Sequence, residues 1–116
     1  MNQFFGIGRL GRDPEVRYFD NGNSVATFSL AIDRGPNKDG DKQPPVWVPC
    51  KAWGKQSQLV ADLLHKGTKV AVSGRLDLEE WTTRDGEKRS KLIVSVFRFE
   101  LCESRQQPAH DEDPPF

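Results

Sequence analysis

Apolar and polar residues alternate with a period of two along most of the chain, which is the pattern of half-buried β-strands. The clearest case is the segment 24–34, whose predicted core-facing residues are Ala26, Phe28, Leu30 and Ile32. Its other face is expected to carry Val25 and Thr27. Further strands, bounded by glycine, proline or Asn/Asp turns, are predicted over residues 2–12, 15–19, 46–53, 68–81 and 88–101.

One helix is predicted over residues 55–65, because apolar residues recur there at three-to-four spacing. These residues are Leu59, Val60, Leu63 and Leu64. Gly67 offers a left-handed stop after the helix. Residues 35–45 contain many Gly, Pro, Asn and Asp residues and almost no apolar side chain, which predicts a mobile loop before the next strand.

The order of these elements is that of the five-stranded OB barrel, with one short helix between strands 3 and 4. The expected fold class is therefore all-β. A chain of 116 residues has room for one core. We expect one domain over residues 1–103 and a disordered tail over residues 104–116, where apolar residues give way to prolines.

Cysteine, histidine and hydropathy patterns exclude several classes of protein. No apolar run approaches the ~18 to 20 residues that cross a bilayer, and a signal peptide is absent, so a cytoplasmic protein without membrane contact is expected. Cys50 and Cys102 fit no disulfide or CxxC pattern and are expected to be packing residues. Two histidines are too few for a cluster, so no metal is expected.

The run 6–11 matches the G-x-G-x-x-G pattern of dinucleotide-binding proteins. That pattern needs a helix opening at its third glycine, whereas here Pro14 follows closely and the next segments alternate with period two. No HExxH, GxSxG or P-loop motif is present, and neither His65 nor His110 has a nucleophile nearby in the sequence. We therefore expect no cofactor and no enzymatic activity.

The 17 basic and 17 acidic residues give a net charge of zero, but they are unevenly placed. Three acids, Asp111, Glu112 and Asp113, lie in the last six residues, so residues 1–110 carry 17 basic against 14 acidic side chains. A surplus of three basic residues is weak support for a nucleic-acid partner. Evidence for such a partner therefore has to come from the positions of the charges.

The segment 46–53 is predicted to place aromatic and basic side chains on one face of a strand. Its expected core-facing residues are Val46, Val48, Cys50 and Ala52. The opposite face carries Trp47 and Trp53, with Lys51 between them. Bases of single-stranded nucleic acid stack on such aromatic faces for about 1–3 kcal/mol each, while Lys51 and the nearby Lys55 can meet phosphates. The alternative is that the indoles pack under a loop or at a subunit contact.

A third tryptophan, Trp81, is expected on the outward face of the next strand, together with Lys69 and Arg75. The inward face of this strand is predicted to carry Val70, Val72, Leu76 and Leu78. The hairpin that follows brings four cations near Trp81, namely Arg84, Lys88, Arg89 and Lys91. The alternative is a solvated, charged hairpin without a ligand.

Four stretches of the chain, residues 8–18, 21–31, 53–55 and 66–82, resemble bacterial single-stranded DNA-binding proteins of the SSB type. The resemblance implies an OB-fold homotetramer, associated with the nucleoid, that wraps single-stranded DNA in replication, recombination and repair. It implies stacking roles for Trp47, Trp53 and Trp81. It also implies that Lys55 and Lys66 lie near the path of the strand.

The acidic terminus is similar to the tip by which such proteins recruit replication and repair enzymes. Its residues are Asp111, Glu112, Asp113, Pro114, Pro115 and Phe116. The eight residues between Cys102 and Asp111 form a shorter linker than is usual in the family, with a reach of only about 26 to 29 Å. The alternative is a merely solubilising acidic end.

Two further departures from the family concern its DNA-binding residues. The segment 34–45 contains no aromatic residue, although the family often carries another stacking tryptophan there. Before Trp81, positions that are often basic in the family are Asp77, Glu79 and Glu80, which predicts lower affinity and a softer salt dependence. Two alternatives stay open: a primosome-type OB dimer, and a structural OB adaptor whose tryptophans are protein contacts.

Overall fold

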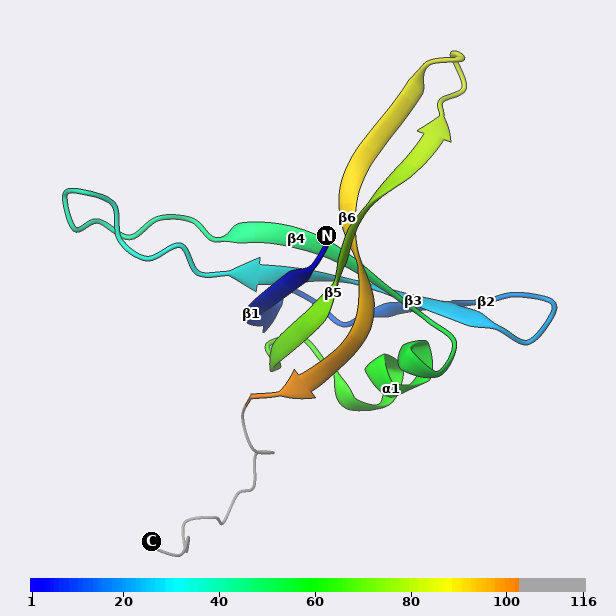
Figure 1. Ribbon diagram of the computed structural model, residues 1–116, viewed down its shortest axis with the longest axis horizontal. Coiled ribbons are helices and arrows are strands. Elements are labelled where there is room, and N and C mark those ends of the chain that lie inside the picture. The colour runs from blue at the N-terminus through cyan, green and yellow to red at the C-terminus, as the bar shows by residue number, and fades with distance from the viewer. Residues whose placement is uncertain (103–116) are drawn as a thin grey trace, which may run out of the picture.

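The computed structural model describes residues 1–102, which form six strands and one helix (Figure 1). The strands are β1 (Phe4–Leu10), β2 (Glu15–Tyr18), β3 (Ser24–Ile32), β4 (Val46–Trp53), β5 (Lys69–Thr82) and β6 (Lys88–Leu101), and the helix is α1 (Lys55–Leu63). Every strand that the alternation predicted is present. The predicted tail, residues 104–116, lies outside the described residues.

Five of the strands pair into a closed ring in the order β1, β5, β6, β4 and β3, and β3 pairs back with β1. The pairings in this ring are antiparallel except that of β4 with β6. The helix α1 follows the third strand of the ring, so the predicted order is confirmed. Three hairpin-like arms, β2–β3, β3–β4 and β5–β6, extend outward from the ring (Figure 1).

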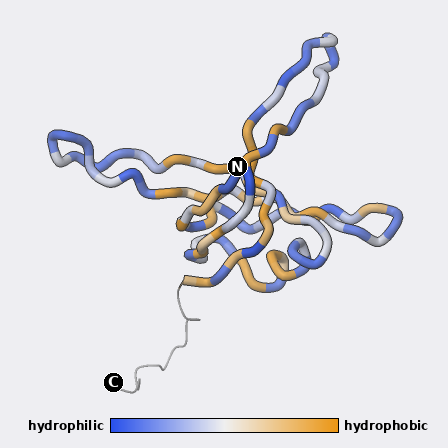
Figure 2. The backbone as a smooth tube through the Cα atoms, in the orientation of Figure 1, coloured by the Kyte–Doolittle hydropathy of each residue, from blue (hydrophilic) through white to orange (hydrophobic). Residues whose placement is uncertain are grey.

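The hydrophobic core lies inside the ring. It contains Leu10, Ala26, Phe28, Leu30, Cys50, Ala52, Val60, Leu64, Val70, Val72, Val94 and Val96. Most of these residues occupy alternate positions of strands, and burying one Val, Leu or Phe side chain stabilises a fold by about 1.5–3 kcal/mol. Figure 2 shows that hydrophobic positions gather around the ring and that hydrophilic ones dominate the ends of the arms.

The β5–β6 arm carries Leu76 and Leu78 beyond the core, which corrects the prediction that they are buried. They occupy the same alternate positions of β5 as Val70 and Val72, but they are 45% and 52% exposed. The reason is that the arm extends past the ring, so within residues 1–102 its inward side lies beyond the core. Leu92, opposite Leu78 on β6, is exposed for the same reason.

The helix is shorter than predicted and buries fewer residues. It ends at Leu63, and both Leu59 and Leu63 are exposed, because only the side with Val60 faces the ring. Leu64 then leaves the helix in an extended conformation and packs into the core. Gly67 has a positive φ of 86°, but it lies in the following turn, so the prediction that it stops the helix is wrong.

Three other burial predictions are wrong. Val25 is buried, although the alternation placed it outward, because it lies between Arg17 of β2 and Trp53 of β4 in the sheet register. Val46 is exposed, since it stands at the base of the β3–β4 arm. Cys102 is exposed and is not a packing residue.

The predicted loop at 35–45 forms a turn organised by the side chain of Asn37. Its Oδ1 atom accepts the backbone N–H groups of Asp39 and Asp41 at 2.8 and 2.9 Å. Pro36 and Lys42 form a single bridge below this turn. The loop therefore has a defined backbone conformation, while its mobility stays a prediction.

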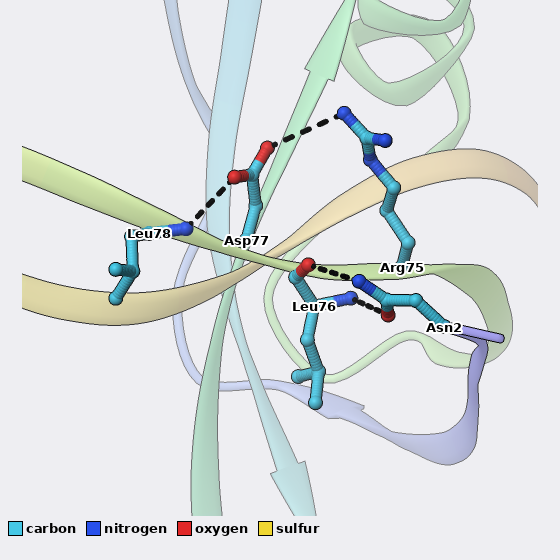
Figure 3. Close-up of polar contacts among 5 residues, drawn as sticks. All are labelled: Asn2, Arg75, Leu76, Asp77 and Leu78. Carbon is cyan, nitrogen blue, oxygen red and sulfur yellow. Dashed lines mark hydrogen bonds and ion pairs between the residues drawn. The ribbon is translucent and has the colours of Figure 1, made fainter.

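Asn2 fastens the N-terminal segment to the base of the β5–β6 arm (Figure 3). Its side-chain Nδ2 donates to the backbone oxygen of Leu76 at 2.9 Å, and its Oδ1 accepts the Leu76 N–H at 2.9 Å. The amide thus continues the β1–β5 pairing beyond Phe4 and Gly74. Among residues 1–102, no helix has the length and hydropathy of a membrane span.

Candidate nucleic-acid interface

The outward face of β4 carries two half-exposed indoles with a lysine between them. Trp47 is 55% exposed and Trp53 is 46% exposed, whereas the inward neighbours Cys50 and Ala52 are fully buried. The strand alternation places Lys51 on the outward side as well. The six-residue interval between the two tryptophans corresponds to about 20 Å along the strand.

Cross-strand pairing sets Arg17 beside the Trp53 end of this face. Val25 is paired with Trp53 on one side and with Arg17 on the other. Residues directly opposite in antiparallel strands point to the same side of the sheet, with Cβ atoms about 4.5–5.5 Å apart. Arg17, Val25 and Trp53 therefore form one row across β2, β3 and β4, and the side chain of Arg17 is exposed.

A second row crosses the ring at Trp47. Ala31 pairs with Trp47 and also with Arg9, and Arg9 pairs with Lys69 of β5. Arg9 and Lys69 thus lie on the same outward side of the sheet as the indole of Trp47. Trp47 also lies against Gly11, where an added Cβ atom would come within 2.6 Å of its ring. This contact gives the ring a supporting surface on one side.

Lys51 is held by an acid from the β5–β6 arm. Its Nζ atom donates a hydrogen bond to Oε2 of Glu79, and Nζ of Lys91 lies 3.8 Å from Oε1 of the same carboxylate. The hydrogen bond from Lys51 lowers the pKa of Glu79, so the carboxylate is ionised at neutral pH. One carboxylate therefore bridges two lysines from two different strands.

A groove of about 500 Å³ runs over this region. It is lined by Glu15, Val16, Arg17, Val25, Thr27, Lys51 and Glu79. Val25, the cross-strand neighbour of Trp53, is among these lining residues. The groove therefore joins the β2–β3–β4 surface to the β5–β6 arm.

Trp81 stands on the same side of β5 as Glu79 and is 45% exposed. Its partner across the arm is Arg89, and the partner of Glu79 is Lys91. The guanidinium of Arg89 is engaged with Glu87 at 2.8 Å. The ion pair between Glu79 and Lys51 thus connects the side of β5 that carries Trp81 to the outward face of β4.

The other predicted phosphate ligands lie at different places on the molecule. Arg75 is on β5 near Asp77, with 3.7 Å between Nη2 and Oδ2 (Figure 3). Lys55 begins α1 just after Trp53 and is exposed. Arg84 and Lys88 are exposed at the far end of the β5–β6 arm.

Lys66 and Lys69 lie at the opposite end of β5 from Trp81. The strand has 14 residues, which corresponds to about 45 Å. Lys69 lines a second groove, between β1 and the base of the β3–β4 arm, while Lys66 is exposed in the turn before β5 and its backbone N–H donates to Asp13. The structure therefore groups Lys69 with Trp47, and Lys51 with Trp53 and Trp81.

Arg9 and Arg17 are two basic residues of this surface that the sequence reasoning did not select. Arg9 also donates from Nη1 to the Gly67 oxygen at 2.8 Å. Both residues precede β3 in the chain, and only the strand register brings them near Trp47 and Trp53. Within residues 1–102, no group of three or more His, Cys, Asp or Glu side chains is arranged to hold a metal.

A closed ring of five strands with a helix after the third strand defines a small domain of the OB class. The sequence profile of the single-strand binding protein family matches residues 1–102. The chain therefore belongs to this family, and its OB fold follows from that membership.

Individual relatives are similar over nearly the whole chain. Single-stranded DNA-binding protein 1 of Synechocystis sp. is 36% identical over 94% of this chain and 89% of its own length. The single-stranded DNA-binding protein of Thermosynechococcus vestitus is 38% identical over 93% of this chain and 84% of its own length. That of Helicobacter hepaticus is 35% identical over 97% of this chain and 66% of its own length.

Proposed function

We propose that the protein binds single-stranded DNA without sequence preference. The observation that carries this proposal is the connected outward surface on which Trp53 and Trp81 flank Lys51, with Trp47 further along β4. Half-exposed indoles on strands are costly in water and suit unpaired bases, since every base has a flat face to stack. The names of the relatives support the same ligand.

In this proposal stacking supplies much of the affinity, and basic residues neutralise phosphates. Arg17 and Lys51 neutralise phosphates of the bound DNA near Trp53, while Lys69 neutralises phosphates near Trp47. Lys55, Lys66, Arg75, Arg84 and Lys88 extend the basic path along the molecule. The task is binding and protection of DNA rather than catalysis, which agrees with the lack of a catalytic motif.

Quenching of tryptophan fluorescence by oligo(dT) at low salt tests the stacking. The variants Trp53→Ala and Trp81→Ala are each expected to weaken binding by about 1–3 kcal/mol, the free energy of one stacked base. Tyr18→Ala is the matched control, because Tyr18 is 69% exposed but lies on the opposite face of β2 from Arg17. Duplex DNA of equal length should quench far less.

Unchanged emission at saturating oligo(dT) would contradict the stacking assignment. If the duplex bound as tightly as the single strand, the preference for unpaired bases would be wrong. In that case the exposed indoles would be better explained as contacts with other proteins.

We further propose that the protein is a cytoplasmic, nucleoid-associated homotetramer that acts in replication, recombination and repair. Exposed apolar side chains on β1 and β6 support subunit contacts, since burial between subunits would remove their apolar area from water. They include Phe5, Ile7, Leu92 and Phe97. The acidic tip 111–116, outside the described residues, is proposed to recruit partner enzymes. Native mass spectrometry distinguishes the tetramer from the dimer.

A further inference from the structure

The carboxylate of Glu79 lies between two lysines on the surface that carries Trp53 and Trp81. It bridges Lys51 of β4 and Lys91 of β6, and it lines the groove that runs over Arg17 and Val25. Glu79 precedes Trp81 by two residues on the same side of β5, and Lys51 precedes Trp53 by two residues on the same side of β4. The ion pair therefore stands between two predicted stacking positions.

A strand whose bases stack on Trp53 and Trp81 must carry its backbone past this ion pair. Phosphate oxygens and a carboxylate have the same charge and compete for the same ammonium donors. The Lys51 side chain is only 23% exposed, so it has limited freedom to bind a second anion while Glu79 is bound to it.

We propose that Glu79 occupies a phosphate-binding position in the DNA-free protein and must be displaced from Lys51 when single-stranded DNA enters. Glu79 then limits the affinity for DNA and reduces the salt dependence of binding. This inference rests on the proposed function. It assigns to Glu79 a local competition for Lys51, distinct from the general repulsion that any acid on the arm exerts on DNA.

Glu80 provides a matched control for this inference. It is the next residue on β5, its partner on β6 is Ser90, and the alternation turns its side chain away from Glu79. Among residues 1–102 it forms no ion pair with a side chain. Glu79→Gln and Glu80→Gln each remove one negative charge from neighbouring positions, so a general electrostatic effect is nearly the same in both.

The first experiment titrates oligo(dT) against the full chain and both variants at several salt concentrations. Glu79→Gln is expected to tighten binding about fivefold to tenfold at low salt, and Glu80→Gln less than about twofold. The slope of log K against log salt should steepen by up to about 0.7 in Glu79→Gln, because Lys51 then pairs with a phosphate without giving up a carboxylate, so the full counterion release is seen. Thermal unfolding of each variant shows that the fold is intact.

The second experiment replaces Lys51 by Met in both backgrounds. In the natural chain the loss of Lys51 is expected to weaken DNA binding only about twofold, because the phosphate contact that Lys51 gains is largely offset by the Glu79 contact that it gives up. In Glu79→Gln the same replacement should lose about fivefold to tenfold. This double-mutant cycle isolates the coupling between Lys51 and Glu79 from their separate effects.

Equal effects of Glu79→Gln and Glu80→Gln, or an equal cost of Lys51→Met in both backgrounds, would overturn the inference while leaving single-strand binding intact. Weaker binding by Glu79→Gln would also overturn it, because Glu79 would then position Lys51 for DNA. A natural chain that failed to bind oligo(dT) at all would refute the proposed function, and the inference with it.

Discussion

The two cysteines illustrate how differently single residues of one type are placed in this molecule. Cys50 is fully buried on the inward face of β4, and this burial raises the pKa of its thiol to about 12. Cys102 is exposed just after β6. Because the thiolate is the reactive form, Cys50 is protected both by its pKa and by the surrounding core.

Alkylation at pH 8 should therefore distinguish the two thiols. In the native protein iodoacetamide is expected to modify Cys102 and to leave Cys50 unmodified, and in concentrated urea it should modify both. Peptide mass spectrometry after a short reaction measures each site. Modification of Cys50 as fast as that of Cys102 under native conditions would contradict the burial of β4.

At the scale of elements, the closure of the ring depends on a close approach of β5 to β6 at Gly74. The register between these strands shifts at Ser73 and Gly74, which marks a β-bulge where the arm leaves the ring. A Cβ atom at Gly74 would lie 2.0 Å from the backbone oxygen of Ser95. No side chain can move to relieve this clash, so one of the two strands would have to shift.

Gly74→Ala is expected to destabilise the protein by about 1–3 kcal/mol, the usual cost of overpacking a well-packed site. Urea unfolding followed by circular dichroism measures this change. Ser73→Ala, one residue earlier, is the control and should stay within about 0.5 kcal/mol of the natural chain. Similar stabilities of the two variants would argue against a tight strand contact at the bulge.

At the scale of the whole molecule, the surface that carries the three tryptophans contains many basic residues, whereas the C-terminal segment is acidic. The surface around Trp47, Trp53 and Trp81 carries basic residues from five strands, whereas Asp111, Glu112 and Asp113 add three negative charges near the end of the chain. We expect this acidic segment to compete with DNA for the basic surface, since charges attract over about 10 Å at 0.1 M salt.

Removal of residues 111–116 should tighten the binding of oligo(dT) at low salt, and the difference should shrink as salt screens the charges. Fluorescence titration of the full and truncated chains at two salt concentrations measures both effects. The truncated chain is also expected to lose its proposed partner enzymes. Equal affinities at low salt would speak against the competition, though not against partner recruitment.

Much of the architecture could be predicted from local patterns. Alternation identified the buried positions Ala26, Phe28 and Leu30 correctly, because a strand with one face in a core repeats every two residues. The same rule failed for Leu76 and Leu78, which have the right parity on an arm that leaves the core. The odd or even position of a residue determines which side of the strand its side chain faces. Its burial depends on whether another element packs against that side.

The chain's own sequence determined the order of the strands, the position of helix α1 and the outward direction of the three tryptophans, since these follow from short-range periodicity. Only the tertiary structure decided that Lys51 meets Glu79, 28 residues away, and that Arg17 shares a row with Trp53. These partners come from different strands, and their meeting depends on register and ring closure, which no local pattern encodes.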